Sequence, residues 1–256
     1  MYAKHLLVLL MTLMAGAADS GTLKACVPAH PSAPFRLSEA EGQAQRLIAL
    51  AVGLQGDFVE FLSAPWVRCL AGMHESQYDM IVGVEPDPDF YSFIAFPRKA
   101  SKIDTSRRLG TVEYVVVQKV GAVAAWDGKA FKHMGLPLIV PRSIPVVLRR
   151  LAQLGVEAKG FNYDPGRFVS MLLRGRADAV VLRRHEATLV LSRGSFPGLT
   201  EVQEHPLVAT DVYLGFRPSL LKSKPGYADA IWRDIGRIRS SPSWPANSGE
   251  AFAQRQ

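Results

Sequence analysis

The chain has 256 residues with an ordinary globular composition: 48% are hydrophobic and 21% charged, with 21 Gly and 17 Pro. This balance excludes a disordered tract, a collagen-like repeat and a coiled coil, and the length allows one large domain or two modest ones. The 30 Lys and Arg against 23 Asp and Glu give a net charge of +7, which suits an anionic partner but is too diffuse to require nucleic acid. The 2 cysteines are too few for a disulfide-rich scaffold.

Residues 1–18 have the pattern of a secretory signal peptide. A short basic region contains Lys4 and His5, an apolar run covers residues 6–13, and residues 15–17 form the small-x-small pattern of a cleavage site. The apolar run is well short of the ~20 residues that span a bilayer, so a retained anchor is the weaker alternative. We expect cleavage and a periplasmic mature protein with 29 basic and 23 acidic residues, since Lys4 is removed.

Beyond the signal, short apolar runs alternate with helical patterns, which is typical of α/β architecture with mostly parallel strands. Strands are predicted over residues 23–27, 58–62, 80–84, 114–118, 138–140, 179–182 and 212–216. Helices are predicted over residues 42–53, 66–73, 143–154 and 227–238, and from Pro165 to just before Gly175. Ser143 and Asp164 are the expected N-caps of the third and fourth helices, because short polar side chains satisfy the free N–H groups there.

One pattern occurs twice in the chain and suggests two similar lobes. Residues 77–82 and 176–181 both follow a predicted helix, place an Asp at the start of a strand and continue with apolar residues. The alternative is that any two βα units look alike. The chain has no low-complexity linker, so the crossover between two lobes is expected in ordered strands near Tyr114 and Val212.

Five short motifs occur in order along the chain, at residues 66–70, 78–83, 114–117, 126–128 and 172–179. Together this set, spanning roughly residues 22–240, resembles the extracytoplasmic solute-binding proteins of the amino-acid ABC transporter type (the bacterial extracellular solute-binding protein family 3), in the order of that family. The resemblance implies the two-lobed type II periplasmic-binding-protein fold, in which each lobe is a mixed, mostly parallel sheet flanked by helices and hinge strands join the lobes. Lobe 1 would comprise residues 19–112 and 211–256, and lobe 2 residues 113–210.

The resemblance also implies a ligand cleft between the lobes. In the family an aromatic residue after the first strand stacks on the ligand, which Phe35 matches, and one before the second helix forms another wall, which Trp66 matches. Ligands in open α/β folds bind beyond the carboxyl ends of strands and at helix N-termini. The segments Gly83-Val84-Glu85 in lobe 1 and Arg142-Ser143 in lobe 2 occupy such positions.

The sequence departs from the family at the groups that hold an amino-acid zwitterion. Where the family carries an Arg shortly after the Gly83 position, this chain has an acidic, Pro-rich segment at residues 85–90; where the family carries an acidic residue beyond Asp178, it has Arg183-Arg184. The clamp is therefore reversed in charge, which leaves two alternatives, a zwitterion in the opposite orientation or a dianion held by Arg142, Arg183 and Arg184. We expect an anionic or polar organic solute, and the expected ligand-binding residues are Phe35, Trp66, Gly83, Val84, Glu85, Arg142, Ser143 and Arg183.

Cys26 and Cys69 would lie in the same lobe, on a strand and on a helix. A disulfide between them would close a loop of 43 residues and is compatible with a periplasmic location. The alternative is two separately buried thiols, since free Cys behaves as a small apolar residue.

Signatures of common catalytic and metal sites are absent from the sequence. There is no G-x-S-x-G, H-E-x-x-H, P-loop or G-x-G-x-x-G motif, and the 6 histidines are scattered. Glu85, Asp87 and Asp89 lack the spacing of a calcium loop and are better explained as a solvated turn. We expect no metal, no cofactor and no nucleic-acid partner, because the basic pairs lack interleaved aromatic residues.

The expected function is a monomeric periplasmic receptor for a small solute, which serves an inner-membrane ABC permease or another periplasmic system. One alternative is a dehydratase-like enzyme on the same scaffold, with Glu85, Asp164, His185 or Glu186 as acid or base. Another is a pair of lobes that binds a protein.

Overall fold

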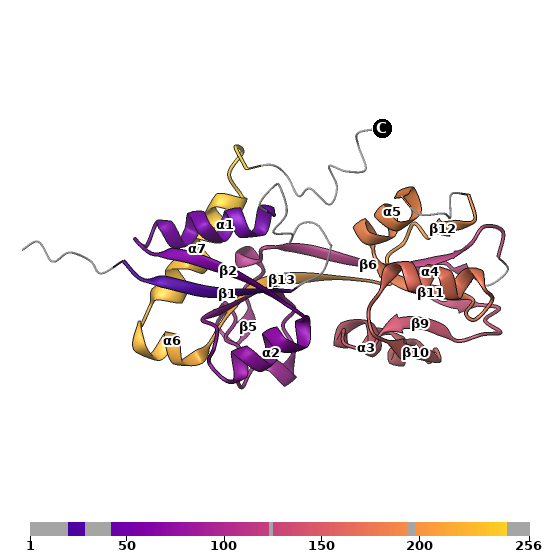
Figure 1. The fold of residues 1–256 in the computed structure, drawn as a ribbon, viewed down its shortest axis with the longest axis horizontal. Coiled ribbons are helices and arrows are strands. Elements are labelled where there is room, and N and C mark those ends of the chain that lie inside the picture. The colour runs from indigo at the N-terminus through magenta and orange to yellow at the C-terminus, as the bar shows by residue number, and fades with distance from the viewer. Residues whose placement is uncertain (1–19, 29–41, 123–124, 194–197, 245–256) are drawn as a thin grey trace, which may run out of the picture.

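The computed structural model describes residues 20–28, 42–122, 125–193 and 198–244. Within these ranges two α/β groups lie at opposite ends of an elongated molecule, joined by two long strands (Figure 1). None of the helices in these ranges has the length and apolar character needed to cross a membrane. The predicted signal segment, Phe35 and the C-terminal end lie outside the described residues.

Lobe 1 contains three parallel strands with two helices between them. Its elements are β1 (Thr22–Pro28), α1 (Gln43–Gly53), β2 (Phe58–Ala64), α2 (Trp66–His74) and β3 (Met80–Val84). β1 lies in the middle and pairs parallel with β2 and β3. The helices α6 (Pro218–Ser223) and α7 (Tyr227–Arg239) return to this lobe from the C-terminal part of the chain.

Lobe 2 repeats this arrangement with a second set of elements. They are β9 (Leu138–Pro141), α3 (Pro145–Leu154), β10 (Ala158–Phe161), α4 (Pro165–Leu173) and β11 (Ala179–Arg183), followed by α5 (Arg184–Arg193) and β12 (Thr200–Val202). β9 lies in the middle and pairs parallel with β10 and β11. The small elements are η1 (Pro88–Phe90), β4 (Arg98–Lys99), β5 (Lys102–Ile103), η2 (Thr105–Arg107), β7 (Ala125–Trp126) and β8 (Phe131–Lys132).

Two antiparallel strands, β6 (Gly110–Lys119) and β13 (Val208–Phe216), connect the lobes (Figure 1). They pair with each other over residues 110–114 and 208–212; β6 then pairs with β11, and β13 with β3. Within the described ranges the pairing is thus continuous through one nine-stranded sheet, whereas the sequence predicts a separate sheet in each lobe. Both connecting strands are longer than predicted, because each serves one lobe at one end and the crossing at the other.

The apolar cores remain separate on the two sides of this crossing. In lobe 1, α1 and α7 cover one face of the strands and α2 the other; in lobe 2, α3 and α4 take the two faces. Along the chain, the change from a lobe 1 cluster to a lobe 2 cluster falls between Leu109 and Val112. The change back to a lobe 1 cluster falls between Val212 and Tyr213. We keep the division into two lobes as a proposal, with these four clusters as its support.

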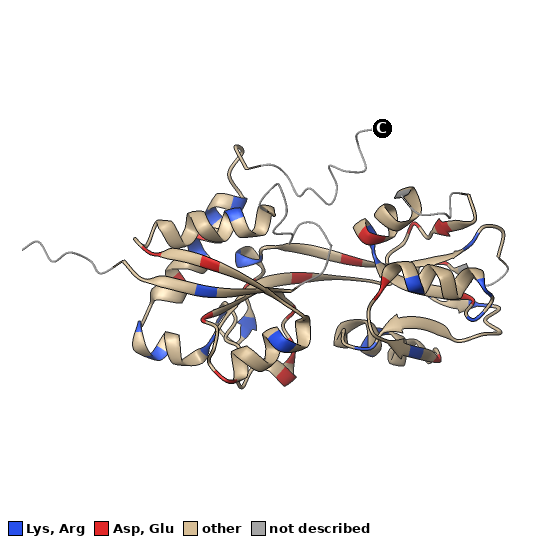
Figure 2. Ribbon diagram, viewed as in Figure 1, with Lys and Arg blue, Asp and Glu red and all other residues tan. Residues whose placement is uncertain are grey.

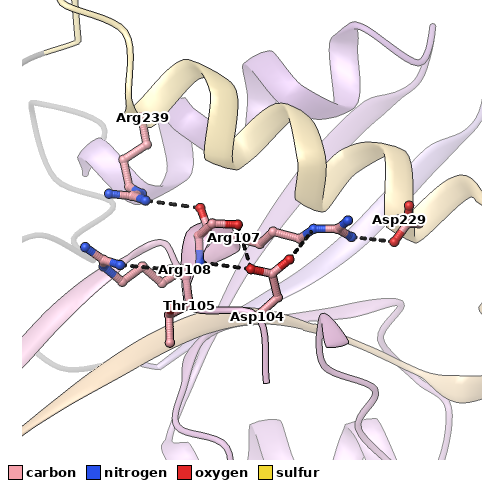
Figure 3. Close-up of polar contacts among 7 residues, drawn as sticks. Asp104, Thr105, Arg107, Arg108, Asp229 and Arg239 are labelled. Carbon is pink, nitrogen blue, oxygen red and sulfur yellow. Dashed lines mark hydrogen bonds and ion pairs between the residues drawn. The ribbon is translucent and has the colours of Figure 1, made fainter. Parts of the chain in front are cut away.

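The segment before β6 is fixed to the C-terminal helix of lobe 1 (Figure 3). Arg107 forms ion pairs with Asp229 on α7 and, at 3.0 Å, with Asp104. Arg239 of α7 donates a hydrogen bond to the carbonyl of Ser106 at 3.1 Å. One end of the connection between the lobes is therefore anchored to lobe 1.

The predicted helix starts are partly confirmed. Asp164 is the N-cap of α4 and accepts a hydrogen bond from the backbone N–H of Arg167 at 2.9 Å. The prediction for α3 was wrong: the cap position is Ile144, and Ser143 lies outside the helix. Pro145 explains the shift, because a proline disfavours the helical conformation in the residue before it, and Ile144 has φ −117° and ψ 91°.

The repeated Asp has the same structural role in both lobes. Asp79, before β3, accepts a hydrogen bond from the backbone N–H of Lys24 on the neighbouring strand at 2.8 Å. Asp178, before β11, accepts from the N–H groups of Gly135 and Leu136, just before the neighbouring β9, at 2.6 Å each. The repeated pattern in the sequence therefore marks a repeated contact between two adjacent strands.

Candidate functional site

A cavity lies between the lobes beside the strands that connect them. Its volume is about 50 Å³, several times the ~10–15 Å³ that one water requires. The residues that line it come from the end of β1, from β3 and the segment after it, from α2, from both connecting strands, from the starts of α3 and α4 and from the end of β11. They are Pro28, Trp66, Val82, Gly83, Glu85, Phe90, Val112, Tyr114, Ser143, Ile144, Pro145, Tyr163, Arg183 and Val212.

A β-bulge at Gly83 precedes Glu85 at the cavity. Tyr213 of β13 pairs with Val84 and Leu214 pairs with Val82, so that Gly83 is the extra residue on β3. Gly83 has φ +74°, a conformation that suits glycine and strains other residues. A bulge bends a strand and redirects the side chains that follow it. The bulge at Gly83 lies two residues before Glu85, whose carboxylate lines the cavity.

Glu85 is half-buried where it lines the cavity. Its Oε1 accepts a hydrogen bond from the hydroxyl of Tyr114 at 2.6 Å. Among the described residues, no Lys, Arg or His nitrogen lies within 4.0 Å of its carboxylate. Burial raises the pKa of Glu85 above its ordinary value, although the Tyr114 hydrogen bond and the more distant charge of Arg183 act in the opposite direction.

Arg183, at the end of β11, is surrounded by groups that stabilise its charge. Its guanidinium lies 5.8 Å from the ring centres of both Tyr114 and Tyr163, and its Nη1 is 3.9 Å from Oε1 of Glu186. Its Nε–H donates to the hydroxyl of Tyr114 at 3.4 Å. Burial alone would lower the pKa of Arg183, but the Tyr114, Glu186 and Tyr163 side chains together raise it above its ordinary value.

Tyr163 connects this arginine to the acidic residue behind it. Its hydroxyl accepts a hydrogen bond from the backbone N–H of Arg183 at 3.0 Å and donates one to the carboxylate of Glu186. The Glu186 residue is only 5% exposed. Burial raises the pKa of the Tyr163 phenol, so the group stays a neutral donor to Glu186.

An aromatic wall on the lobe 1 side is held by a disulfide. The rings of Trp66 and Phe90 meet edge to face with 6.3 Å between their centres. Trp66 opens α2, and Cys69 in the next turn of that helix forms a disulfide with Cys26 of β1. The disulfide was one of two alternatives from the sequence, and the structure decides for it. It fixes the start of α2 against the central strand and so positions Trp66.

An ion pair joins the lobes next to the cavity. Arg149 on α3 donates to Oδ2 of Asp87 at 2.5 Å. The Asp87 side chain is 3% exposed and that of Arg149 is 52% exposed. Together with the hydrogen bond between Tyr114 and Glu85, this pair holds the loop after β3 against lobe 2.

The predicted ligand-binding residues fall into three groups. Trp66, Gly83, Glu85, Ser143 and Arg183 line the cavity. Phe35 lies outside the described residues.

The remaining two lie elsewhere. Val84 is fully buried in the core of lobe 1, because the bulge at Gly83 turns its side chain toward the residues that pack behind β3. Arg142 is exposed and is not among the residues that line the cavity; its backbone N–H continues the pairing toward β10 by bonding to the Phe161 carbonyl at 3.0 Å. We therefore leave both residues out of the site.

The structure does not support the dianion alternative, because two of the three arginines that it requires do not line the cavity. Arg184 forms an ion pair with Glu113 and donates to the Glu204 carbonyl at 3.0 Å, and like Arg142 it does not line the cavity. Arg183 is thus the basic residue that the described part of the chain places there. The described residues therefore do not bring Arg142, Arg183 and Arg184 together in the cavity, as a dianion would require.

Other groups considered for chemistry lie away from the cavity. Asp164 caps α4, and His185 and Glu186 lie in α5 without lining the cavity. Within the described ranges, no group of three His, Cys, Asp or Glu side chains is arranged to hold a metal ion. In the view of Figure 2, acidic and basic positions are interspersed over both lobes.

Tyr114, Tyr163 and Phe90 line the cavity and are not among the ligand-binding residues predicted from the sequence. Tyr114 had been placed in the expected crossover, and a strand that connects two lobes necessarily forms the floor of the cleft between them. Tyr163 directly precedes the Asp164 cap, and helix starts face the cleft in this architecture. Phe90 follows the acidic segment and carries no pattern that separates a cavity residue from a core residue.

Solved structures show which fold this is. A substrate-binding protein of an amino-acid ABC transporter has a TM-score of 0.64 at 14% identity, covering 92% of this chain and 100% of that one. The periplasmic VFT2 domain of BvgS from Bordetella pertussis has a TM-score of 0.59 at 20% identity, over 86% and 88%. A Streptococcus pneumoniae ABC uptake transporter substrate-binding protein with bound histidine has 0.63 at 14%, over 86% and 87%.

These likenesses show the type II periplasmic-binding-protein fold, as the sequence predicted. No protein-family model and no curated protein matches the chain.

Proposed function

We propose that this chain is a periplasmic solute-binding protein that takes up a small polar organic molecule between its two lobes. The cavity itself carries the proposal, because polar groups from both lobes converge there: Glu85 from lobe 1, and Ser143 and Arg183 from lobe 2. A solute that contacts both lobes at once stabilises the arrangement in which they approach each other. Binding free energy can then drive closure of the lobes.

The composition of the cavity wall favours a small organic solute. Trp66, Phe90 and Tyr114 provide aromatic surface, and Val82, Val112 and Val212 provide aliphatic surface. Mostly apolar walls with a few placed polar groups are typical of sites for small molecules. Of the acid–base candidates weighed from the sequence, Glu85 alone lines the cavity, so we propose binding rather than catalysis.

The partner and the location belong to the proposal as well. The similar structures include substrate-binding proteins of ABC transporters and a periplasmic VFT2 domain of BvgS. We propose that this chain, after removal of residues 1–18, works as a monomer in the periplasm. There it delivers its solute to an ABC-type permease or reports it to another periplasmic system.

A thermal-shift screen of the purified mature protein tests the binding function. The panel includes amino acids, amines, dicarboxylates, sugar acids and small anions. We expect at least one class to raise the melting temperature, because a ligand that binds the native state stabilises it. Mass spectrometry of molecules released from gently purified, then denatured protein identifies a solute that co-purifies.

Two variants separate cleft binding from adventitious binding. Trp66→Ala should abolish the shift caused by the solute, because it removes an aromatic wall of the cavity. Phe58→Ala is the matched control, because Phe58 is an aromatic residue of the same lobe that is 68% exposed and lies outside the cavity. A melting temperature that no class raises, or a shift that survives Trp66→Ala unchanged, would overturn the proposal.

A further inference from the structure

We propose that the cleft binds the cationic head group of an organic amine, with Glu85 as its counter-ion. This inference rests on the proposed function and assigns the chemical class of the ligand. It reverses the expectation of an anionic solute that the arginine-rich segment at residues 183–184 had suggested.

The charges around the cavity are unequally compensated. Of the described residues that line it, Glu85 is the acidic residue and Arg183 is the basic residue. Arg183 has Glu186 3.9 Å away as its counter-ion, whereas Glu85 has no cation within 4.0 Å in the described part of the chain. The group of Glu85, Arg183 and Glu186 therefore has a net charge of −1 when Glu85 is ionised. A cationic ligand neutralises this charge, and an anionic ligand adds to it.

The geometry of Glu85 leaves room for a donor from a ligand. Within the described residues, Tyr114 is its hydrogen-bond partner, and this bond involves Oε1. The second oxygen, Oε2, has no hydrogen-bond partner among those residues and is not sealed from solvent. An ammonium group has three donors and can bond to Oε2, and hydrogen bonds between charged partners are the strong ones.

The aromatic wall suits the same ligand class. Trp66 and Phe90 line the cavity on the lobe 1 side with their ring centres 6.3 Å apart, and Tyr114 lines it on the connecting strand. A cation within about 6 Å of an aromatic face is attracted by the negative charge of that face, and tryptophan is the best partner. A carboxylate gains nothing from the negative faces of these rings.

An anion would meet a guanidinium that is already engaged. Arg183 lies between the rings of Tyr114 and Tyr163, donates through Nε to one phenol and faces Glu186 with Nη1. A ligand carboxylate at Arg183 would approach Glu186 and Glu85 at the same time. We therefore assign Arg183 to the fixed wall of the cavity, where it orders both tyrosines.

The inference predicts a pH dependence of binding. The charged and titratable groups that act on Glu85 are Tyr114, Arg183, Arg149 and Asp87. Burial outweighs them and raises the pKa of Glu85, so its charge is lost on acidification earlier than that of an exposed glutamate. A primary amine stays protonated up to a pH near 10. Affinity for an amine should therefore decrease as the pH is lowered from neutral and Glu85 becomes protonated.

Matched probes with a similar carbon skeleton and different charged groups test the ligand class. One set is n-butylammonium, butyrate and 4-aminobutyrate; a second is phenethylammonium, 3-phenylpropionate and phenylalanine. Melting temperature and calorimetric affinity are measured on the mature protein at neutral pH. We expect an amine of at least one set to bind and the carboxylate of the same set not to bind.

Variants assign the effect to Glu85. Glu85→Gln keeps the shape of the side chain and an acceptor for Tyr114, and should weaken amine binding at least about 10-fold, the loss expected for a charged hydrogen bond. It should also remove the pH dependence. Glu60→Gln is the matched control, because Glu60 is an exposed residue of β2 and lies outside the cavity; its affinity should equal that of the wild type.

The outcomes separate this inference from the proposed function. Binding of carboxylates without amines, binding of the zwitterions alone, or amine binding that Glu85→Gln leaves intact would overturn the inference while the binding function stands. A chain that binds no member of these sets and none of the wider solute panel overturns both. The comparison of amines with carboxylates on the wild type does not depend on how well any variant folds.

Discussion

The two lobes share one plan and differ in the charge that they present to the cleft. In lobe 1 the strand order is β2-β1-β3 with β13 antiparallel at the end; in lobe 2 it is β10-β9-β11 with β6 antiparallel at the end. Each lobe places an Asp before its third strand and ties it to the neighbouring strand, through Asp79 and Asp178. The scaffold is therefore repeated, and the contrast lies at the ends of the third strands.

At that point lobe 1 carries Glu85 and lobe 2 carries Arg183. Arg183 has an acidic partner and two aromatic rings within its own lobe or the connecting strand, whereas Tyr114, a neutral group, is the donor that the described part of the chain provides to Glu85. Lobe 1 also has a disulfide, and lobe 2 has no cysteine. In lobe 2 the charge of Arg183 is therefore paired within the protein, while in lobe 1 Glu85 holds the charge that we propose a ligand neutralises.

Loss of the disulfide should have the largest effect, and it should be confined to lobe 1. Closing a loop of 43 residues stabilises the protein by about 4 kcal/mol in the chain-entropy model. We expect Cys26→Ser with Cys69→Ser to lower the free energy of unfolding by about that amount, measured by urea denaturation. Hydrogen exchange should increase in α2 and β1 and not in β9 to β11. Equal changes in both lobes would contradict the separate cores.

The second largest effect should come from removing Arg183, whose charge is paired with that of Glu186. Removing one partner of a buried ion pair costs about 3–5 kcal/mol, since it leaves the other charge unpaired. We expect Arg183→Met to lower stability by about 3 kcal/mol. Glu186→Gln in the same protein should restore part of the loss, because it removes the unpaired carboxylate. A double variant that loses the sum of the two single effects would show that Glu186 does not balance Arg183.

The bulge before Glu85 gives a smaller effect. Gly83→Ala places a Cβ on a residue with φ +74°, which costs about 1–2 kcal/mol. Gly175, which also has a positive φ (+69°) but follows α4 in lobe 2, is the matched control. Both Ala variants should lose similar stability by thermal denaturation, whereas only Gly83→Ala should weaken solute binding, because it displaces Glu85. Equal affinities for the two variants would separate the bulge from the site.

The ion pair between the lobes should have the smallest effect. Arg149 is half exposed, and such pairs contribute about 0.2–1 kcal/mol. We expect Arg149→Gln to leave the melting temperature nearly unchanged and to weaken solute affinity up to about 5-fold, because the pair favours the arrangement in which the lobes approach. Arg150→Gln, at the neighbouring position on α3, is the control. A larger loss of affinity for Arg150→Gln would exclude this role for Arg149.

The sequence predicted the repeated architecture well and the site in part. Strand β3 and helices α1, α2 and α7 lie within a few residues of their expected bounds, because their apolar periods are regular. Trp66, Gly83 and Glu85 were found through a family resemblance and through their position after a strand. These predictions succeeded because the order of strands and helices follows from local patterns in the sequence.

The remaining parts depend on distant contacts. The pairing of Arg183 with Glu186 and Tyr163 decides which charge is available, and only the folded chain brings Tyr163 to them. Helix α5 was missed, because its apolar positions are irregular and it begins directly at the end of β11. Arg142 was assigned to a helix start that Pro145 moves by two residues, which takes its side chain away from the cavity.

A crystal structure of the protein with the amine that raises its melting temperature most would test the central claim most directly. The account predicts density between the lobes, with the ligand nitrogen within hydrogen-bond distance of Oε2 of Glu85 and the ligand against the ring of Trp66. Arg183 should keep its place beside Glu186. A ligand bound through an anionic group to Arg183, with Glu85 facing no part of it, would contradict the account.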